Sequence, residues 1–215
     1  MKFSENCRLC PRLANFLDEV KVSHPGYHAK PVSPFGDDSP ELLVVGLAPG
    51  LHGANRTGRP FTGDHAGILL YETLYKFGFS SQAASEVGDA LVLKGCRITN
   101  AVKCLPPQNK PDNAEIRQCN AYLAQEIDDL DHGSAILALG TIAHNAVLFA
   151  LKLKAKDYPF GHGNIHDLPG GLGLHDSYHC SRYNTQTRRL TREMFEAVFE
   201  AICKGRKPCH TSTSG

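Results

Sequence analysis

Residues 46–64 read GLAPGLHGANRTGRPFTGD, and they directly follow ELLVV at residues 41–45. The apolar run is short and rich in branched side chains, which is typical of a buried strand. The glycines and prolines after it are incompatible with the interior of a helix or strand. Helical periodicity resumes over residues 65–77. The order of strand, glycine-rich loop and helix predicts a binding site, because open α/β sheets bind ligands at the carboxyl ends of their strands.

The composition of this loop limits the kinds of ligand that it can hold. It contains neither GxxxxGK[ST] nor GxGxxG, so the known phosphate-loop mechanisms are not supported. A chance surface loop is the alternative interpretation, although loops of this length in compact domains are usually functional. A flat and partly anionic ligand suits the polar, charged and aromatic groups that the loop offers, namely His52, Asn55, Arg56, Arg59, Phe61 and Asp64.

Length and charge restrict the class of protein. The chain has 215 residues and a net charge of +1, so any contact with nucleic acid requires a local basic patch. We predict a single domain over residues 1–209, followed by a tail at residues 210–215 (HTSTSG) that is disordered or foreign to the natural chain. Because there is no long apolar segment and no apolar signal sequence, we expect a cytoplasmic monomer that does not contact membranes.

The rest of the chain alternates between strand and helix patterns. Further strands are predicted at residues 91–102, 135–139 and 171–177, and further helices at residues 13–22, 114–130, 142–151 and 190–202. Loops are predicted at residues 23–40, 152–171 and 179–187. This alternation predicts a parallel sheet with helices on both faces.

Eight cysteines are many for a chain without a secretion signal, which favours metal ligation over disulfides. Cys7 and Cys10 form a C-x2-C pair. Their natural partners are Cys104, just after a predicted strand, and Cys119, on the following helix. Four thiolates suit a [4Fe–4S] cluster or a structural zinc ion, and the spacing does not choose between them. The alternative is that Cys104 and Cys119 are small buried apolar residues.

Two further segments are expected at the same edge of the sheet as the loop. Asn100 ends one predicted strand, and its amide has the donors and the acceptor needed to read the edge of a base. His179 follows the last predicted strand. The densest basic cluster comes next, and it suits either contact with phosphates or a solvated helix start; it consists of Arg182, Arg188, Arg189 and Arg192.

These segments together resemble family 5 of the uracil-DNA glycosylases. The loop at residues 46–64 is similar to the first motif of that family, and Asn100 with residues 101–104 and residues 177–184 are similar to later motifs. The four cysteines match its iron–sulfur ligands, so the resemblance implies a [4Fe–4S] cluster rather than zinc. It also implies a three-layer α/β/α sandwich with a central four-stranded parallel sheet. The implied activity is monofunctional hydrolysis of the N-glycosidic bond of uracil, with other deaminated bases as further candidates, in single- or double-stranded DNA.

The resemblance also implies roles for individual residues. Phe61 stacks on the extruded base, Asn100 bonds to its Watson–Crick edge and His179 faces the uracil O2. Backbone amides near Leu47 and Ala48 contribute further contacts. Such donors stabilise the negative charge that develops on the departing base, and stacking offsets part of the cost of extruding it.

The attacking water needs a different residue, because Leu47 and Ala48 cannot accept a proton or orient water. We hypothesise that Asp64 takes this role or stabilises the sugar cation, with His52 and Asn55 as weaker candidates. The residues expected to contact DNA are Arg59, Ser181, Arg182, Arg188 and Arg189.

Two positions depart from the family pattern. Cys180 stands where proline usually follows the histidine, and Arg188 stands where glycine usually precedes Arg-Leu. Both departures lie in the loop that is expected to wedge into DNA. They leave the range of bases and the strand preference open.

Two other classes of protein compete with the enzyme. One is a damage-binding protein that has lost hydrolysis, which predicts binding to uracil-containing DNA without an abasic product. The other is a cluster- or zinc-stabilised module that binds a free nucleobase, which predicts no affinity for DNA. A purely redox role for an iron–sulfur cluster would leave the rest of the site unexplained.

Overall fold

The structure, a computed structural model, describes residues 3–205. The tail predicted at residues 210–215 lies outside the described residues. Within the described part of the chain, every helix is too short or too polar to cross a membrane.

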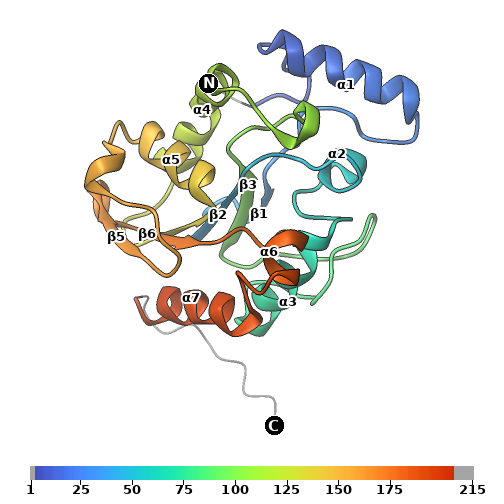
Figure 1. Cartoon of the computed structure of the whole chain (residues 1–215). Helices are drawn as coiled ribbons and strands as arrows, with labels where there is room; N and C mark the ends of the chain where they lie inside the picture. Colours follow the sequence, from blue (N-terminus) through green and yellow to red (C-terminus); the bar gives the residue numbers. More distant parts are fainter. Residues whose placement is uncertain (1–2, 206–215) are drawn as a thin grey trace.

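A single mixed sheet forms the centre of the molecule (Figure 1). Its strand order is β1-β3-β2-β4-β6-β5. The strands are β1 Phe35–Gly36, β2 Leu42–Gly46, β3 Cys96–Asn100, β4 Ala135–Leu139, β5 Ile165–Leu168 and β6 Leu172–Ser177. The four inner strands are parallel, and β1 and β5 pair antiparallel at the two edges.

The predicted four-stranded sheet is therefore wrong in its strand number, although the four parallel strands are present. Both added strands lie in segments predicted as loops. Strand β1 has only two residues, and in β5 exposed residues alternate with less exposed ones, so that only Leu168 is buried. A short or exposed edge strand needs no continuous apolar run, so the pattern that identified the inner strands is missing there.

Helices cover both faces of the sheet (Figure 1). They are α1 Pro11–Ser23, α2 Ala54–Thr57, α3 His65–Lys76, α4 Asn113–Asp128, α5 Thr141–Ala150, α6 Arg182–Gln186 and α7 Arg192–Lys204. Leu42 and Val44 of β2 pack with α3 and α7, whereas Leu43 and Val45 pack with α4 and α5. Every residue of β2 is buried, as expected for a central parallel strand. The short helices α2 and α6 lie within segments predicted as irregular.

The register of the strands positions the site. Gly46 at the end of β2 is paired with Asn100 at the end of β3, and Leu139 of β4 is paired with Ser177 of β6. The segments that follow these strands therefore all leave the sheet at the carboxyl ends of its parallel strands, which form one edge of the sheet. This confirms the expectation that the glycine-rich loop, Asn100 and His179 meet there.

Candidate functional site

A cavity of about 580 Å³ opens at this edge of the sheet. It is lined by residues from the glycine-rich loop, the end of β3 and the segment after β6. The predicted site residues that line it are Leu47, Ala48, His52, Phe61, Asp64, Asn100, His179, Ser181 and Arg182.

Two glycines make the wall of the cavity possible. A Cβ atom at Gly46 would lie 2.5 Å from Asn100 Oδ1 and 2.7 Å from the ring of Phe61. A Cβ atom at Gly67 would lie 1.8 Å from the carbonyl oxygen of Phe61. Phe61 itself has a φ of 53°, in the left-handed region that non-glycine residues rarely adopt. Gly46 therefore lets Phe61 and Asn100 approach the end of β2 closely, and Gly67 lets the backbone of Phe61 approach α3.

Asp64 is fixed between the loop and α3. It is the N-cap of α3, and its Oδ1 accepts a hydrogen bond from the Gly67 amide at 3.2 Å. Its Oδ2 lies against Gly53, where a Cβ atom would approach it to 2.3 Å. Burial raises the pKa of the Asp64 carboxyl above its usual value. The carboxylate is thus held at the cavity wall, and in these surroundings it takes up a proton more readily than a carboxylate in water.

His179 lies beside Phe61, with their ring centroids 5.8 Å apart and the rings inclined by 28°. Its carbonyl oxygen accepts a hydrogen bond from Asn184 Nδ2 at 2.8 Å. Burial lowers the pKa of His179 to about 4, so the imidazole is neutral at pH 7. A neutral imidazole in this position can donate one N–H bond to a ligand. Asn100, only 4% exposed, adds an amide to the same wall.

His52 and Asn55 have different surroundings. His52 lines the cavity, and its Nδ1 is 2.8 Å from the hydroxyl of Tyr27. Asn55, in α2, is fully buried and does not line the cavity. Neither its side-chain oxygen nor its nitrogen has a hydrogen-bond partner. An orphaned buried amide of this kind calls for a bound water or ligand.

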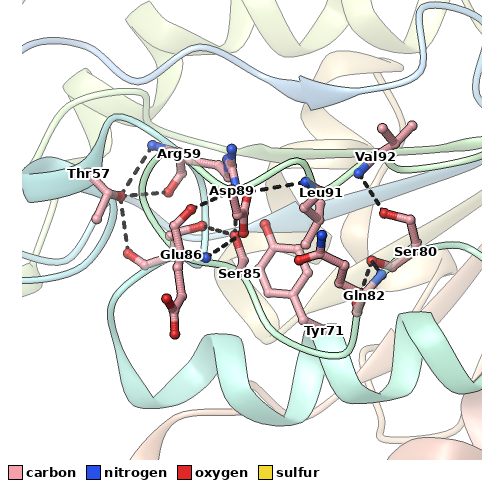
Figure 2. Close-up of polar contacts among 12 residues, drawn as sticks. Thr57, Arg59, Tyr71, Ser80, Gln82, Ser85, Glu86, Asp89, Leu91 and Val92 are labelled. Carbon is pink, nitrogen blue, oxygen red and sulfur yellow. Dashed lines mark hydrogen bonds and ion pairs between the residues drawn. The ribbon is translucent and has the colours of Figure 1, made fainter.

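Arg59 points away from the cavity. Its Nη1 is 2.6 Å from Asp89 Oδ1 and also donates to the hydroxyl of Ser85 and the carbonyl of Glu86 (Figure 2). The guanidinium also lies 4.5 Å from the ring centroid of Phe35. These contacts use the side chain to hold residues 85–89 against the loop, and a DNA contact by Arg59 stays a prediction.

The arginines after β6 are placed differently from one another. Arg182 lines the cavity. Arg188 is exposed and has a φ of 56°, so the position where the family pattern has glycine does adopt the left-handed conformation. The guanidinium of Arg189 lies 4.6 Å from the ring centroid of Tyr178.

Sequence reasoning missed several residues of the site. Tyr183, which follows the cavity-lining Arg182 on α6, is 70% exposed. A large exposed aromatic side chain could have been suspected from its position among arginines. Tyr27 could not have been, because only the folded chain brings it to His52. The cavity is also lined by Leu51, His65 and Asn109.

The four predicted cysteine ligands converge at a second place. Cys7, Cys10, Cys104 and Cys119 line one small apolar cavity between α1, α4 and the segment after β3. The Lys103 amide donates to Cys119 Sγ at 3.3 Å, and the hydroxyl of Tyr122 donates to Cys7 Sγ at 3.4 Å. Donors of this kind stabilise metal-bound thiolates, so the residues present fit a metal cluster.

The same surroundings hold protons on the free thiols. Burial is the largest cause that raises the pKa of Cys104 and Cys119, and it raises the pKa of Cys10 to about 11, with the neighbouring cysteines adding to the shift. Binding of a metal must therefore release these protons.

Comparisons with known proteins agree with the geometry. The pattern of the uracil DNA glycosylase superfamily matches residues 33–203. The chain is 49% identical to a type-5 uracil-DNA glycosylase of Thermus thermophilus, over 91% of this chain and 92% of the relative. It is 40% identical to a type-5 uracil-DNA glycosylase of Mycobacterium bovis, over 92% of this chain and 77% of the relative. A type-4 uracil-DNA glycosylase of Thermotoga maritima is 30% identical, over 79% of this chain. The chain therefore belongs to the type-5 uracil-DNA glycosylases of the uracil DNA glycosylase superfamily.

Proposed function

We propose that this protein hydrolyses the N-glycosidic bond of uracil in DNA and leaves an abasic site. The observation that carries the proposal is that Phe61, Asp64, Asn100 and His179 line one cavity although they come from separate segments. The cavity volume of about 580 Å³ lies in the range of small-molecule sites. A base in duplex DNA reaches such a cavity only after it is extruded from the stack.

His179 and Asn100 are placed to stabilise the departing base. Cleavage leaves negative charge on the uracil oxygens, and donors that are already oriented there lower the barrier. Because burial lowers the pKa of His179 to about 4, its imidazole is neutral at pH 7 and keeps one N–H that can donate to the base. We assign His179 to the uracil O2, Asn100 to the Watson–Crick edge and Phe61 to stacking.

Asp64 is our candidate for orienting the attacking water or stabilising the sugar cation. Its carboxylate lies at the cavity wall and is fixed by the Gly67 amide. The raised pKa moves it toward the range of a general base. The unpartnered amide of Asn55 supports a bound water behind the loop, which is the contribution that we propose for Asn55.

DNA contacts are proposed around the mouth of this cavity. Ser181 and Arg182 line it, and the exposed Arg188 follows on the same segment. Arginine contacts to phosphates would position the strand without reading its sequence. The exposed ring of Tyr183 offers a surface for an unstacked base.

We further propose that the four cysteines hold a [4Fe–4S] cluster. Among residues 3–205, no three cysteine sulfurs lie within 4.8 Å of one another. Tetrahedral zinc with Zn–S bonds of about 2.3 Å would draw the sulfurs to about 3.8 Å. The wider spacing supports a larger group, which would cross-link the segment before α1 to α4. Iron and sulfide content with a visible absorption spectrum would test it.

The main experiment uses end-labelled single- and double-stranded oligonucleotides that carry one uracil. Hot alkali after incubation breaks any abasic site. Scission that requires both protein and alkali supports a monofunctional glycosylase. Binding without scission would instead favour a damage-binding protein. The absence of both binding and scission would favour a module for free nucleobases. Asp64→Asn and His179→Ala are the matched variants; cleavage close to wild type in either would remove that residue from the mechanism.

A further inference from the structure

A buried ion pair stands behind the site without touching the cavity. Asp176, in β6, is completely buried, and His144, in α5, is 1% exposed. His144 Nδ1 lies 2.7 Å from Asp176 Oδ1. His144 Nε2 lies 2.8 Å from the carbonyl oxygen of Tyr158, to which it must donate.

The two contacts of His144 show whether a proton or a metal ion joins His144 to Asp176. Both ring nitrogens face oxygen acceptors, so a proton must be shared between Nδ1 and Oδ1. A metal ion bonded to both atoms at about 2.0–2.2 Å would keep them about 3 Å apart or more, which the 2.7 Å separation does not allow. His166 Nε2, 3.6 Å from the other carboxylate oxygen, is bonded instead to the carbonyl of Pro159. The group is therefore a proton-linked pair and not a cation site.

The pair fixes the loop at residues 158–164 to the end of β6. Asp176 Oδ2 accepts a hydrogen bond from the Gly161 amide at 3.3 Å. The backbone of Asp176 adds bonds to Gly163 and Asn164, each 2.9 Å long. Together with the bond from His144 to Tyr158, these contacts leave the loop little freedom.

The loop in turn fixes the residue before His179. His162 Nδ1 accepts a hydrogen bond from the Tyr178 amide at 3.2 Å, and the two rings stack with centroids 5.1 Å apart. The guanidinium of Arg189 also packs on Tyr178, 4.6 Å from the ring centroid. The pair, the loop and Tyr178 thus form a continuous chain of contacts that ends at the backbone of His179.

We propose that His144 and Asp176 are positioning residues, which hold His179 at the base oxygen through the loop at residues 158–164 and Tyr178. The inference rests on the proposed function, because it concerns the placement of a group that acts in excision. It predicts that loss of the pair lowers the rate of the chemical step while binding of DNA is kept.

The test compares replacements that differ only in whether they keep the hydrogen bonds. Asp176→Leu removes the acceptor for both His144 and Gly161 and leaves no buried charge. Asp176→Asn keeps both bonds, because its amide can donate to a neutral His144 and its oxygen can accept from Gly161. Asn120→Leu is the control, since it also removes a buried polar side chain, and its hydrogen bond, from Nδ2 to the carbonyl of Ala146 in α5 at 2.8 Å, does not involve the loop at residues 158–164.

Single-turnover excision of uracil is measured beside the Kd for the same DNA. Asp176→Leu is expected to slow excision about 100-fold, the effect of misplacing a catalytic group by about 1 Å. Asp176→Asn and Asn120→Leu should stay within about threefold of wild type, and Kd should change less than threefold in all of them. A normal rate in Asp176→Leu, or an equal loss in Asn120→Leu, would overturn the proposal.

Hydrogen exchange of the Tyr178 amide is the second measurement, and it does not depend on activity. Exchange should speed up in Asp176→Leu and stay slow in the other two variants. Should Asp176→Leu fail to fold, His162→Leu removes the same bond to Tyr178 near the surface and must slow excision in its place. A wild-type protein without excision would reject the proposed function, whereas slow exchange in a folded Asp176→Leu would reject the positioning role alone.

Discussion

Adding one methyl group at Gly46 is expected to disable the site while leaving the fold intact. Gly46 ends β2 with a regular strand backbone, so alanine is compatible with its conformation. Its Cβ atom, however, would lie 2.5 Å from Asn100 Oδ1 and 2.7 Å from the ring of Phe61. Carbon atoms pack favourably at about 3.5–4.0 Å. Each neighbour must therefore shift by about 1 Å.

The two costs of this shift are separable. Overpacking of this kind lowers the free energy of unfolding by about 1–3 kcal/mol. Displacing catalytic groups by about 1 Å can cost about 100-fold in rate, which corresponds to about 2.7 kcal/mol of transition-state stabilisation. The side chains that shift are the two that we assign to the base, so excision should fall about 100-fold while the protein stays folded, because domains are typically stable by about 5–15 kcal/mol.

Gly173→Ala is the matched control for Gly46→Ala. Gly173 also lies in a parallel strand, but its Cβ atom would meet only the ring of His175, with Nε2 at 3.4 Å and Cδ2 at 3.8 Å. Urea unfolding and single-turnover excision of uracil would be measured for both variants. We expect Gly173→Ala to match wild type in rate. Excision by Gly46→Ala within about twofold of wild type would refute the assignment of Asn100 and Phe61 to the base.

Three further predictions follow from individual side chains. His179 should add no step near pH 6.5 to the pH profile of the single-turnover rate, because burial lowers its pKa to about 4. A step near pH 6.5 that remains in Asp64→Asn would contradict this, since that variant lacks the carboxyl whose pKa burial raises. Thermal stability should fall as the pH decreases from 6.5 toward 4, because unfolded His175 and His179 take up protons that the folded protein excludes, and melting curves would show it. Arg188→Gly should stabilise the protein by about 1 kcal/mol, because glycine adopts a φ of 56° without strain. The same change should weaken DNA binding and lower the salt dependence of the binding constant by the amount expected for about one phosphate contact. Unchanged binding would show that Arg188 does not contact the DNA.

The inner sheet and the site loop could be predicted because their signals are local. The strand at residues 135–139 was placed without error, since a fully buried parallel strand must be a continuous apolar run. The capped start of α4 is equally local, as the side chain of Glu115 accepts from the Asp112 amide three residues earlier. The edge strands β1 and β5 carry no such run, so they were missed.

The contacts behind the site could not be predicted because they join distant segments. Tyr27 meets His52, and Arg59 meets Asp89, across separations that no local pattern encodes. Arg59 illustrates the consequence, because an arginine in a binding loop suggests a ligand contact. Only the fold shows that its charge is already paired.

Two broken local rules nevertheless fall in the glycine-rich loop that lines the cavity, which supports its assignment as the site. Phe61 keeps a left-handed backbone, and Asn55 keeps an unpartnered buried amide. Each such feature costs on the order of 1–3 kcal/mol and persists only where the surroundings enforce it. For Phe61 they do: the hydroxyl of Tyr71 donates to the carbonyl of Pro60 at 2.9 Å, and Thr57 Oγ1 donates to the carbonyl of Thr62 at 3.1 Å. Hydrogen bonds on both sides of Phe61 hold its ring at the cavity wall. A stacking platform needs this rigidity, because it must be in place before the base arrives.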